Sequence, residues 1–134
     1  MDSAEVSPCP FCTRIASAPS LQQDGAALAV PDAFPLNPGH TLVIPRRHVA
    51  DLFSLTADEQ ADIWRLVARV RDRILQAHHP DAFNIGVNVG EAAGQTVDHA
   101  HVHVIPRYRG DVPDPRGGVR WVVPARAPYW KDVP

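Results

Sequence analysis

The sequence predicts a single α+β domain in which an antiparallel sheet is covered by one long helix. Its 134 residues are enough for one core, and 45% of them are hydrophobic against 21% charged, the balance of a globular protein. A long amphipathic segment occupies the middle of the chain. Short apolar or alternating runs lie on both sides of it, separated by prolines and glycines. This order of elements is typical of the α+β class.

The helix is expected from Asp58 to about Ala77. Thr56 is the expected N-cap, and Glu59 three residues later completes a capping box. Apolar side chains then recur at the i, i+3, i+4 and i+7 spacing that places them on one stripe. They are Ile63, Leu66, Val67, Val70 and Ile74. The helix is therefore expected to be buried along one side only.

Two strands and a hairpin are expected around this helix. The turn signal Gln23-Asp-Gly25 predicts a hairpin over 21–30. Prolines exclude regular structure from 31–38. The run 39–44 ends in Leu-Val-Ile, which indicates a strand buried on both faces, and Pro45 ends it. Residues 82–89 alternate between apolar and polar side chains and predict a second strand.

The chain ends in a segment rich in proline, glycine and arginine. We expect a structured core over about 9–107 and a tail over 108–134 within one domain, 1–134. A short strand is expected in the tail at 119–123, where valines and a tryptophan are concentrated.

Three histidines alternate with small apolar residues in His99-Ala-His-Val-His103. On an extended strand the three imidazoles line one face, and Ala100, Val102 and Val104 line the core face. Imidazoles are poor core residues, and the segment lies too far from the chain ends to be a purification tag. The pattern indicates a site of one of two kinds: a metal held by imidazoles, or a histidine acting as nucleophile or acid/base. The strand is expected to pair with 82–89 as a hairpin.

The chain has two cysteines, Cys9 and Cys12, in Pro8-Cys-Pro-Phe-Cys12. The prolines favour a rigid, extended or turned backbone here. Three interpretations stay open. A thioredoxin-like redox pair is disfavoured because no strand precedes it. A second interpretation gives the cysteines no special role. A third makes them half of a zinc site that two distant histidines complete.

Charge and hydropathy exclude several classes of protein. The net charge of −2 argues against a general nucleic-acid binder. No apolar run approaches the length of a membrane span. The N-terminal residues Met1–Val6 lack the basic and apolar regions of a signal peptide, so a cytoplasmic protein without nucleic-acid or membrane partners is expected.

Three segments together resemble the histidine triad (HIT) nucleotide hydrolases and transferases. The strongest is Gln95-x-Val-x-His-x-His-x-His-x-x-Pro-Arg107, which resembles the family signature. Pro38-Gly-His-Thr-Leu-Val-Ile-Pro-x-x-His48 and Phe83-Asn-x-Gly-x-Asn-x-Gly90 resemble two further family segments. The opening Cys-Pro-Phe-Cys is similar to bacterial members that bind zinc. The resemblance runs from about Cys9 to Arg107 and implies a HIT-like fold and a homodimer.

The resemblance also implies an activity and its residues. Family members release a nucleoside 5′-monophosphate by attack at the α-phosphorus, and the second triad histidine, here His101, is the nucleophile. His103 is expected to assist as a donor to the α-phosphate. The expected substrate-binding residues are Asp32, Asn88, Gly94, Gln95 and Thr96. Ile15 and Leu28 are weaker candidates for the base pocket, and His40 is interpreted as a structural residue.

For the cysteine pair, the resemblance implies a structural zinc as the cofactor. In family members with this spacing, the remaining ligands correspond to His48 and His99. Cys9, Cys12, His48 and His99 would form a closed set without an open position for water, which is typical of a structural zinc. The site would pin the N-terminal segment to the sheet.

Several functions stay open. Dinucleoside polyphosphates such as diadenosine tetraphosphate are the leading substrates. Adenosine phosphoramidates, including aminoacyl adenylates, and phosphate-dependent nucleotidyl transfer are alternatives. A non-catalytic nucleotide-binding module would bind AMP without turnover. A metalloenzyme with zinc or iron on the triad itself would lose activity at once on chelation while still folded.

Overall fold

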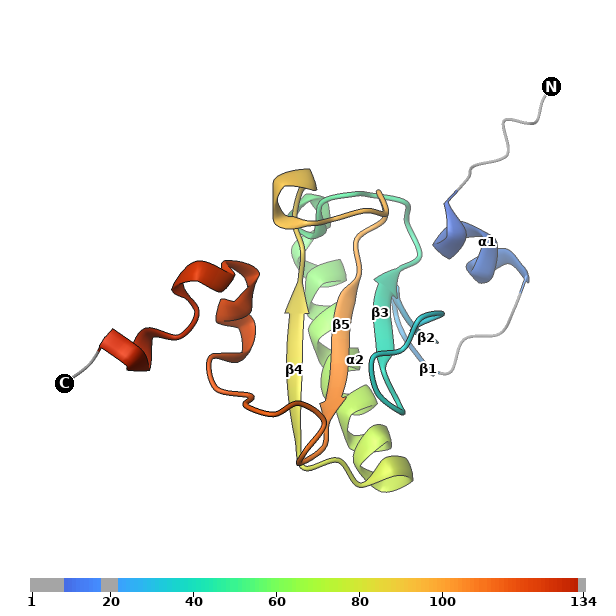
Figure 1. Ribbon diagram of the computed structural model, residues 1–134. Coiled ribbons are helices and arrows are strands. Elements are labelled where there is room, and N and C mark those ends of the chain that lie inside the picture. The colour runs from blue at the N-terminus through green and yellow to red at the C-terminus, as the bar shows by residue number, and fades with distance from the viewer. Residues whose placement is uncertain (1–8, 18–21, 133–134) are drawn as a thin grey trace.

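The computed structural model describes residues 9–17 and 22–132, which form a five-stranded antiparallel sheet with a long helix along one face (Figure 1). The strand order is β1-β2-β3-β5-β4. The strands are β1 (Gln22–Asp24), β2 (Ala27–Pro31), β3 (Thr41–Pro45), β4 (Ala82–Val87) and β5 (Val102–Arg107). The helices are α1 (Pro10–Ser17) and α2 (Ala57–His78). The predicted fold class is confirmed.

Helix α2 begins at its predicted cap. The Thr56 hydroxyl accepts the Glu59 N–H at 3.1 Å, and the Glu59 carboxylate accepts the Thr56 N–H at 2.9 Å. This reciprocal pair satisfies backbone donors that a helix start leaves without partners. The helix ends at His79, whose φ of 54° is the left-handed conformation of a C-cap. All five residues of the predicted apolar stripe are buried.

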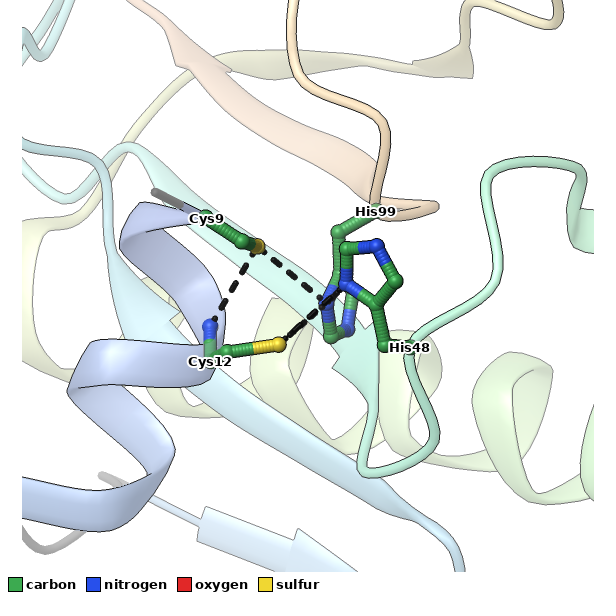
Figure 2. Close-up of side chains that lie close together, drawn as sticks. All are labelled: Cys9, Cys12, His48 and His99. Carbon is green, nitrogen blue, oxygen red and sulfur yellow. Dashed lines mark hydrogen bonds between the residues drawn. The ribbon is translucent and has the colours of Figure 1, made fainter. Parts of the chain in front are cut away.

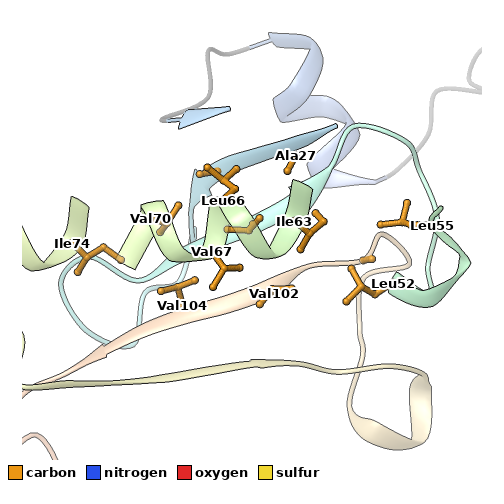
Figure 3. Close-up of a cluster of buried hydrophobic side chains, with 13 residues drawn as sticks. Ala27, Leu52, Leu55, Ile63, Leu66, Val67, Val70, Ile74, Val102 and Val104 are labelled. Carbon is orange, nitrogen blue, oxygen red and sulfur yellow. The ribbon is translucent and has the colours of Figure 1, made fainter. Parts of the chain in front are cut away.

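The sheet has a core on each face. Alternate residues of β2 and β3 face α2, where they join the α2 stripe and Val102 and Val104 of β5 (Figure 3). The intervening residues Leu28, Val30, Leu42 and Ile44 face the other way and pack against α1. The predicted burial of β3 on both faces is confirmed, because every residue of this strand is buried. The histidine side of β5 therefore faces the same layer as α1.

The predicted hairpin forms, with β1 and β2 paired around Gly25; its expected first residue, Leu21, lies outside the described residues. A Cβ at Gly25 would lie 2.3 Å from Asp62 Oδ2, and the glycine φ is +54°. Asp62 comes this close because its carboxylate accepts the Ala26 N–H at 2.9 Å. Glycine at this turn thus lets the hairpin dock on α2.

The Cys-Pro-Phe-Cys segment begins a helix, so the expected extended or turned backbone is wrong. Pro10 is the first residue of α1, a position where the missing N–H costs nothing and the fixed φ is already helical. The Cys9 carbonyl accepts the Thr13 N–H at 3.2 Å, which sets the first turn. Cys9 therefore lies immediately before α1, and Cys12 lies within its first turn.

The tail contains no strand within its described residues, which corrects the prediction for 119–123. Gly118–Val122 form a 3-10 helix, and two more 3-10 turns follow at Pro124–Arg126 and Tyr129–Asp132. Gly117 and Gly118 both have positive φ, and no strand of the sheet pairs with this segment, although β propensity depends on such pairing. In Figure 1 this tail extends past the β4 edge of the sheet.

The tail is attached to β5 by an ion pair. Arg107 donates to both carboxylate oxygens of Asp111 at 2.8 Å, and Asn37 donates to the same carboxylate at 2.8 Å. The Arg107 guanidinium holds the pKa of Asp111 well below its usual range.

Among the described residues, no helix is long and apolar enough to cross a membrane.

Candidate active site and metal centre

His101 lies just before β5 and is 8% exposed. Its Nδ1 is 2.8 Å from the carbonyl oxygen of His99, and because a carbonyl only accepts, Nδ1 carries the proton. The other ring nitrogen, Nε2, then presents a lone pair. A neutral imidazole in this tautomer is suited to nucleophilic attack or to accepting a proton.

His103 contacts a fourth histidine, His40, which immediately precedes β3. The Leu36 N–H donates to His40 Nδ1 at 3.0 Å, so the proton of neutral His40 is on Nε2. That Nε2–H lies 3.0 Å from His103 Nδ1. His103 thereby accepts at Nδ1 and carries its proton on Nε2, the state in which Nε2–H can donate to a bound anion.

Asp32 completes this cluster from the end of β2. Its Oδ2 is 3.3 Å from His40 Nε2 and 3.8 Å from His103 Nδ1, while Oδ1 accepts the Phe34 N–H at 2.8 Å. Burial lowers the pKa of His40, and the Asp32 charge only partly opposes this. Burial also lowers the pKa of His103, with repulsion from His101 and His40 adding to it. Both rings are therefore held in the neutral form.

The interpretation of His40 as a structural residue did not anticipate its hydrogen bond to His103. The strand pairing places Leu42 of β3 opposite His103 of β5, which brings the start of β3 beside the triad. The sequence did offer one signal for a role of His40: a polar residue at the start of a strand that is predicted to be buried on both faces. Register between distant strands, which a single sequence does not reveal, decides that His40 meets His103.

Asp32, His40 and His103 also converge closely enough to be considered as a metal site. The hydrogen bond from Leu36 argues against it. A metal on His40 Nε2 would move the ring proton to Nδ1, where it would face the Leu36 N–H. Two donors would then oppose each other in a buried position, so this cluster favours a hydrogen-bonded pair of histidines over a metal.

The second cluster contains the four predicted metal ligands, which come from α1, the segment after β3 and the segment before β5 (Figure 2). Their ligand atoms all lie within 4.8 Å of one another. His99 Nδ1 is 3.6 Å from Cys9 Sγ and 3.5 Å from Cys12 Sγ. His48 Nδ1 is 3.2 Å from Cys12 Sγ and 3.2 Å from His99 Nδ1.

These distances fit one tetrahedral ion. Zinc with Zn–S of about 2.3 Å and Zn–N of about 2.0 Å separates neighbouring ligand atoms by about 3.3 Å for two nitrogens to about 3.8 Å for two sulfurs. His99 is fully buried, and its Nε2–H donates to the Pro45 carbonyl at 2.8 Å, which leaves Nδ1 free to ligate. Burial lowers the pKa of His99, which favours the neutral ring that a metal requires. The four residues can hold a metal ion.

The predicted substrate-binding residues lie in different surroundings. Asp32 adjoins His103, as described above. Asn88 is half-buried just beyond β4, and Gly94 and Thr96 are exposed on the loop between β4 and β5. Gly94 has a φ of +95° and its Cβ position is open, so the backbone of this turn is accessible.

Gln95 is directed into the protein. Its Oε1 accepts the Gly90 N–H at 2.9 Å, and its Nε2 donates to the Ala50 and Val97 carbonyls at 2.8 and 3.0 Å. Both ends of this amide are occupied, so in this structure Gln95 braces the loop that carries Gly94 and Thr96. The expectation that Gln95 itself donates to a phosphate has no geometric support here.

A cavity of about 600 Å³ opens further along the histidine side of the sheet, between β5 and the tail. Ile105, Arg107 and Trp121 are among its lining residues, and none of the three triad histidines lines it. This cavity is therefore separate from the three histidines that the sequence analysis singled out.

The fold and its two clusters define a class: an α+β protein with a histidine-lined site beside a Cys/His centre. Comparison with known proteins names the family. The HIT domain profile matches residues 16–110. An uncharacterized HIT-like protein of Mycobacterium tuberculosis is 41% identical over 107 residues, 78% of this chain and 74% of that protein. The chain belongs to the HIT family, which confirms the resemblance.

Two further relatives bear on the site. The asymmetrical bis(5′-nucleosyl)-tetraphosphatase of Schizosaccharomyces pombe is 47% identical over 77 residues, which span 58% of this chain and 42% of that enzyme. The crystal structure of a Zn-bound histidine triad family protein from Mycobacterium smegmatis matches with a TM-score of 0.70 and 33% identity, covering 93% of this chain and 97% of that one. A zinc-bound relative thus matches nearly the whole chain.

Proposed function

We propose that this protein is a nucleotide hydrolase that cleaves a nucleoside 5′-monophosphate from its leaving group through a nucleotidyl-His101 intermediate. The observation that carries the proposal is the tautomer of His101, whose Nδ1–H is bound by the His99 carbonyl at 2.8 Å. Nε2 is left as the nucleophile, on a ring that needs no prior deprotonation.

In the first step, the His101 Nε2 lone pair forms a bond to the α-phosphorus as the bond to the leaving group breaks. The ring becomes a cation, and the Nδ1–H bond to the His99 carbonyl stabilises that charge. In the second step, water attacks the phosphorus and gives up a proton to the solvent as the N–P bond breaks, and the nucleoside monophosphate leaves with neutral His101 restored. Splitting one displacement into two lowers each barrier.

His103 is proposed to donate its Nε2–H to the α-phosphate as negative charge develops. The support is its contact with His40, which occupies Nδ1 and directs the proton to Nε2. The exposed Gly94 turn and Thr96 are proposed as further donors, held by Gln95. Asp32 is proposed to bind the ribose hydroxyls, Asn88 to donate to phosphate or ribose, and Ile15 and Leu28 to contact the base.

We further propose that Cys9, Cys12, His48 and His99 hold a structural zinc. The ion would use all four positions for protein ligands, so it would supply rigidity to α1 and no activated water. This arrangement keeps His99 out of the chemical step and leaves His101 as the reacting imidazole.

A homodimer is proposed on the surface of β4 and α2. Strand β4 is one of the two edge strands of the described sheet, and Ile85 on it and Val89 just after it are each 37% exposed. Trp64 of α2 is 43% exposed. An unpaired edge with apolar side chains is an expected site of association with a second copy. Light scattering after gel filtration tests this, because Ile85→Lys should then yield a monomer.

Dinucleoside polyphosphates are the proposed substrates, supported by the named activity of the Schizosaccharomyces pombe relative. The test is incubation with diadenosine tetraphosphate and separation of the products by anion exchange. AMP plus ATP indicates asymmetric hydrolysis. ADP plus ATP formed only with added phosphate indicates a phosphorylase with the same nucleophile. If diadenosine tetraphosphate is not cleaved, incubation with an adenosine phosphoramidate tests an amine as the alternative leaving group.

The experiment needs two variants beside the wild type. His101→Ala should form no product with any of these substrates. His79→Asn is the matched control, because it removes a histidine at the end of α2, far from the triad in the sequence, and asparagine tolerates its left-handed backbone. AMP binding by the wild type with no turnover of any substrate would instead identify a non-catalytic binding module.

A further inference from the structure

Phe11 is the only buried residue of helix α1, and it lies between the two cysteines of the metal cluster. It is 8% exposed. Its ring meets the His101 ring edge to face, with centroids 5.0 Å apart at an angle of 67°. The same ring meets His99 at 5.8 Å and 87°. One aromatic side chain thus contacts both a proposed zinc ligand and the proposed nucleophile.

A single hydrogen bond does not fix the orientation of a nucleophilic imidazole ring. The Nδ1–H bond to the His99 carbonyl fixes one nitrogen, but the ring can still pivot about that bond and swing Nε2. Among the described aromatic residues, two limit this motion: Phe11 and His103, whose ring centroid is 5.2 Å from that of His101. His103 is itself proposed to act on the phosphate, so of these two neighbours Phe11 is the one without a proposed role in the chemical step.

The chemistry of the phenyl ring suits this task. It offers neither a donor nor an acceptor that would compete for the Nε2 lone pair or the Nδ1 proton. Edge-to-face contact is a favoured geometry for two aromatic rings, so the contact selects an orientation of the imidazole as well as a distance. A smaller aliphatic side chain would fill part of the space without defining the angle.

We propose that Phe11 is a positioning residue that couples the Cys/His cluster to the orientation of His101. Cys9 and Cys12 flank Phe11 within one turn of helix, so the contacts that fix the cysteines also fix the phenyl ring. The kinetic part of this inference rests on the proposed hydrolase function. The structural part, the orientation of the His101 ring, does not.

The test compares zinc-loaded Phe11→Leu with the wild type. With diadenosine tetraphosphate, kcat should fall about ten- to a hundredfold, the scale of a misplaced reacting group, while KM changes less than about threefold. Zinc content should equal that of the wild type. Val70→Ala is the control, because it opens a comparable space in the core on the other face of the sheet and should leave kcat unchanged.

A spectroscopic measurement tests the same inference without any turnover. Long-range ¹H–¹⁵N spectra of the imidazoles should show a single Nδ1–H tautomer for His101 in the wild type and averaged ring signals in Phe11→Leu. If the wild type cleaves no nucleotide, the proposed substrate fails and these spectra alone decide about Phe11. Phe11→Met replaces Phe11→Leu if the latter does not fold.

Three results would overturn the inference. The first is an unchanged kcat together with an unchanged His101 spectrum in a folded Phe11→Leu protein. The second is an equal loss of kcat in Val70→Ala, which would indicate a general effect of stability. The third is loss of zinc in Phe11→Leu, because the residue would then act by building the metal site and not by holding the histidine.

Discussion

The carbonyl oxygen of His99 accepts the Nδ1–H of His101 at 2.8 Å, while the side chain of His99 turns toward Cys9 and Cys12. One residue thus serves two sites: its backbone sets the tautomer of His101, the proposed nucleophile, and its side chain joins the Cys/His cluster. Because the hydrogen bond comes from the main chain, it survives any substitution that preserves the path of the backbone. The two sites are therefore connected through the backbone of His99, while different groups of this residue act in each.

Removal of the nucleophile should separate binding from chemistry. His101→Ala should lose at least about a thousandfold in kcat, the scale seen when a catalytic nucleophile is deleted. Its affinity for AMP should stay within about threefold of the wild type, because Asp32 and the Gly94 turn are unaffected. Titration calorimetry with AMP measures this. A large loss of AMP affinity would show that His101 acts chiefly in binding.

His40→Gln tests the hydrogen bond to His103. The variant lacks the defined Nε2–H that lies 3.0 Å from His103 Nδ1, so the tautomer of His103 is no longer dictated. We expect kcat to fall about tenfold or more, within the usual range for a group that aids proton placement. Steady-state kinetics beside His79→Asn measure the effect. Wild-type kcat in a folded His40→Gln protein would assign His40 a purely structural role.

Stability should decrease as the pH falls below about 6.5, the unperturbed pKa of histidine. Burial lowers the pKa of both His40 and His103 in the folded protein. The unfolded chain therefore binds protons more readily, so the stabilisation is complete above the unfolded pKa. It is lost between that value and the lowered folded values, by at most about 1.4 kcal/mol per pH unit for each group.

Urea denaturation between pH 5 and pH 8 measures this dependence. His40→Gln removes one of the two groups and should flatten the curve below about pH 6.5. A curve of unchanged slope in the variant would show that other groups, such as carboxylates, dominate the acid response.

Loss of one thiolate should empty the metal cluster while sparing the nucleophile. Cys12→Ser should carry no stoichiometric zinc and melt at least about 10 °C below the zinc-loaded wild type, since structural metal binding contributes directly to folding. Some turnover should persist, unlike in His101→Ala. Calorimetry and metal analysis measure the two properties.

A chelator provides the matched control. It should lower the melting temperature of the wild type toward that of Cys12→Ser and leave the variant unchanged. Abrupt loss of all activity on chelation, with the wild type still folded, would instead favour a catalytic metal on the triad.

The sequence by itself predicted the long helix, the strands of the sheet and the histidine and cysteine motifs that the fold brings together. The capping box at Thr56, the apolar stripe of α2 and the alternation around His101 are local patterns, and local patterns follow from backbone geometry and hydrogen bonding over a few residues. Motif spacing also identified the family, and the resemblance named Cys9, Cys12, His48 and His99, which lie together in the structure. Segments whose conformation depends on a partner strand were predicted poorly. At 119–123, for example, no strand of the sheet pairs with the valines.

Only the tertiary structure decided which distant groups meet. His40 contacts His103 because the β3–β5 register aligns them, and Gln95 braces its loop because Ala50 and Val97 present carbonyls to it. Phe11 reaches His101 because α1 packs on the sheet face opposite α2. Register and packing are set by the whole core at once, so residues far apart in the chain become neighbours that no local pattern encodes.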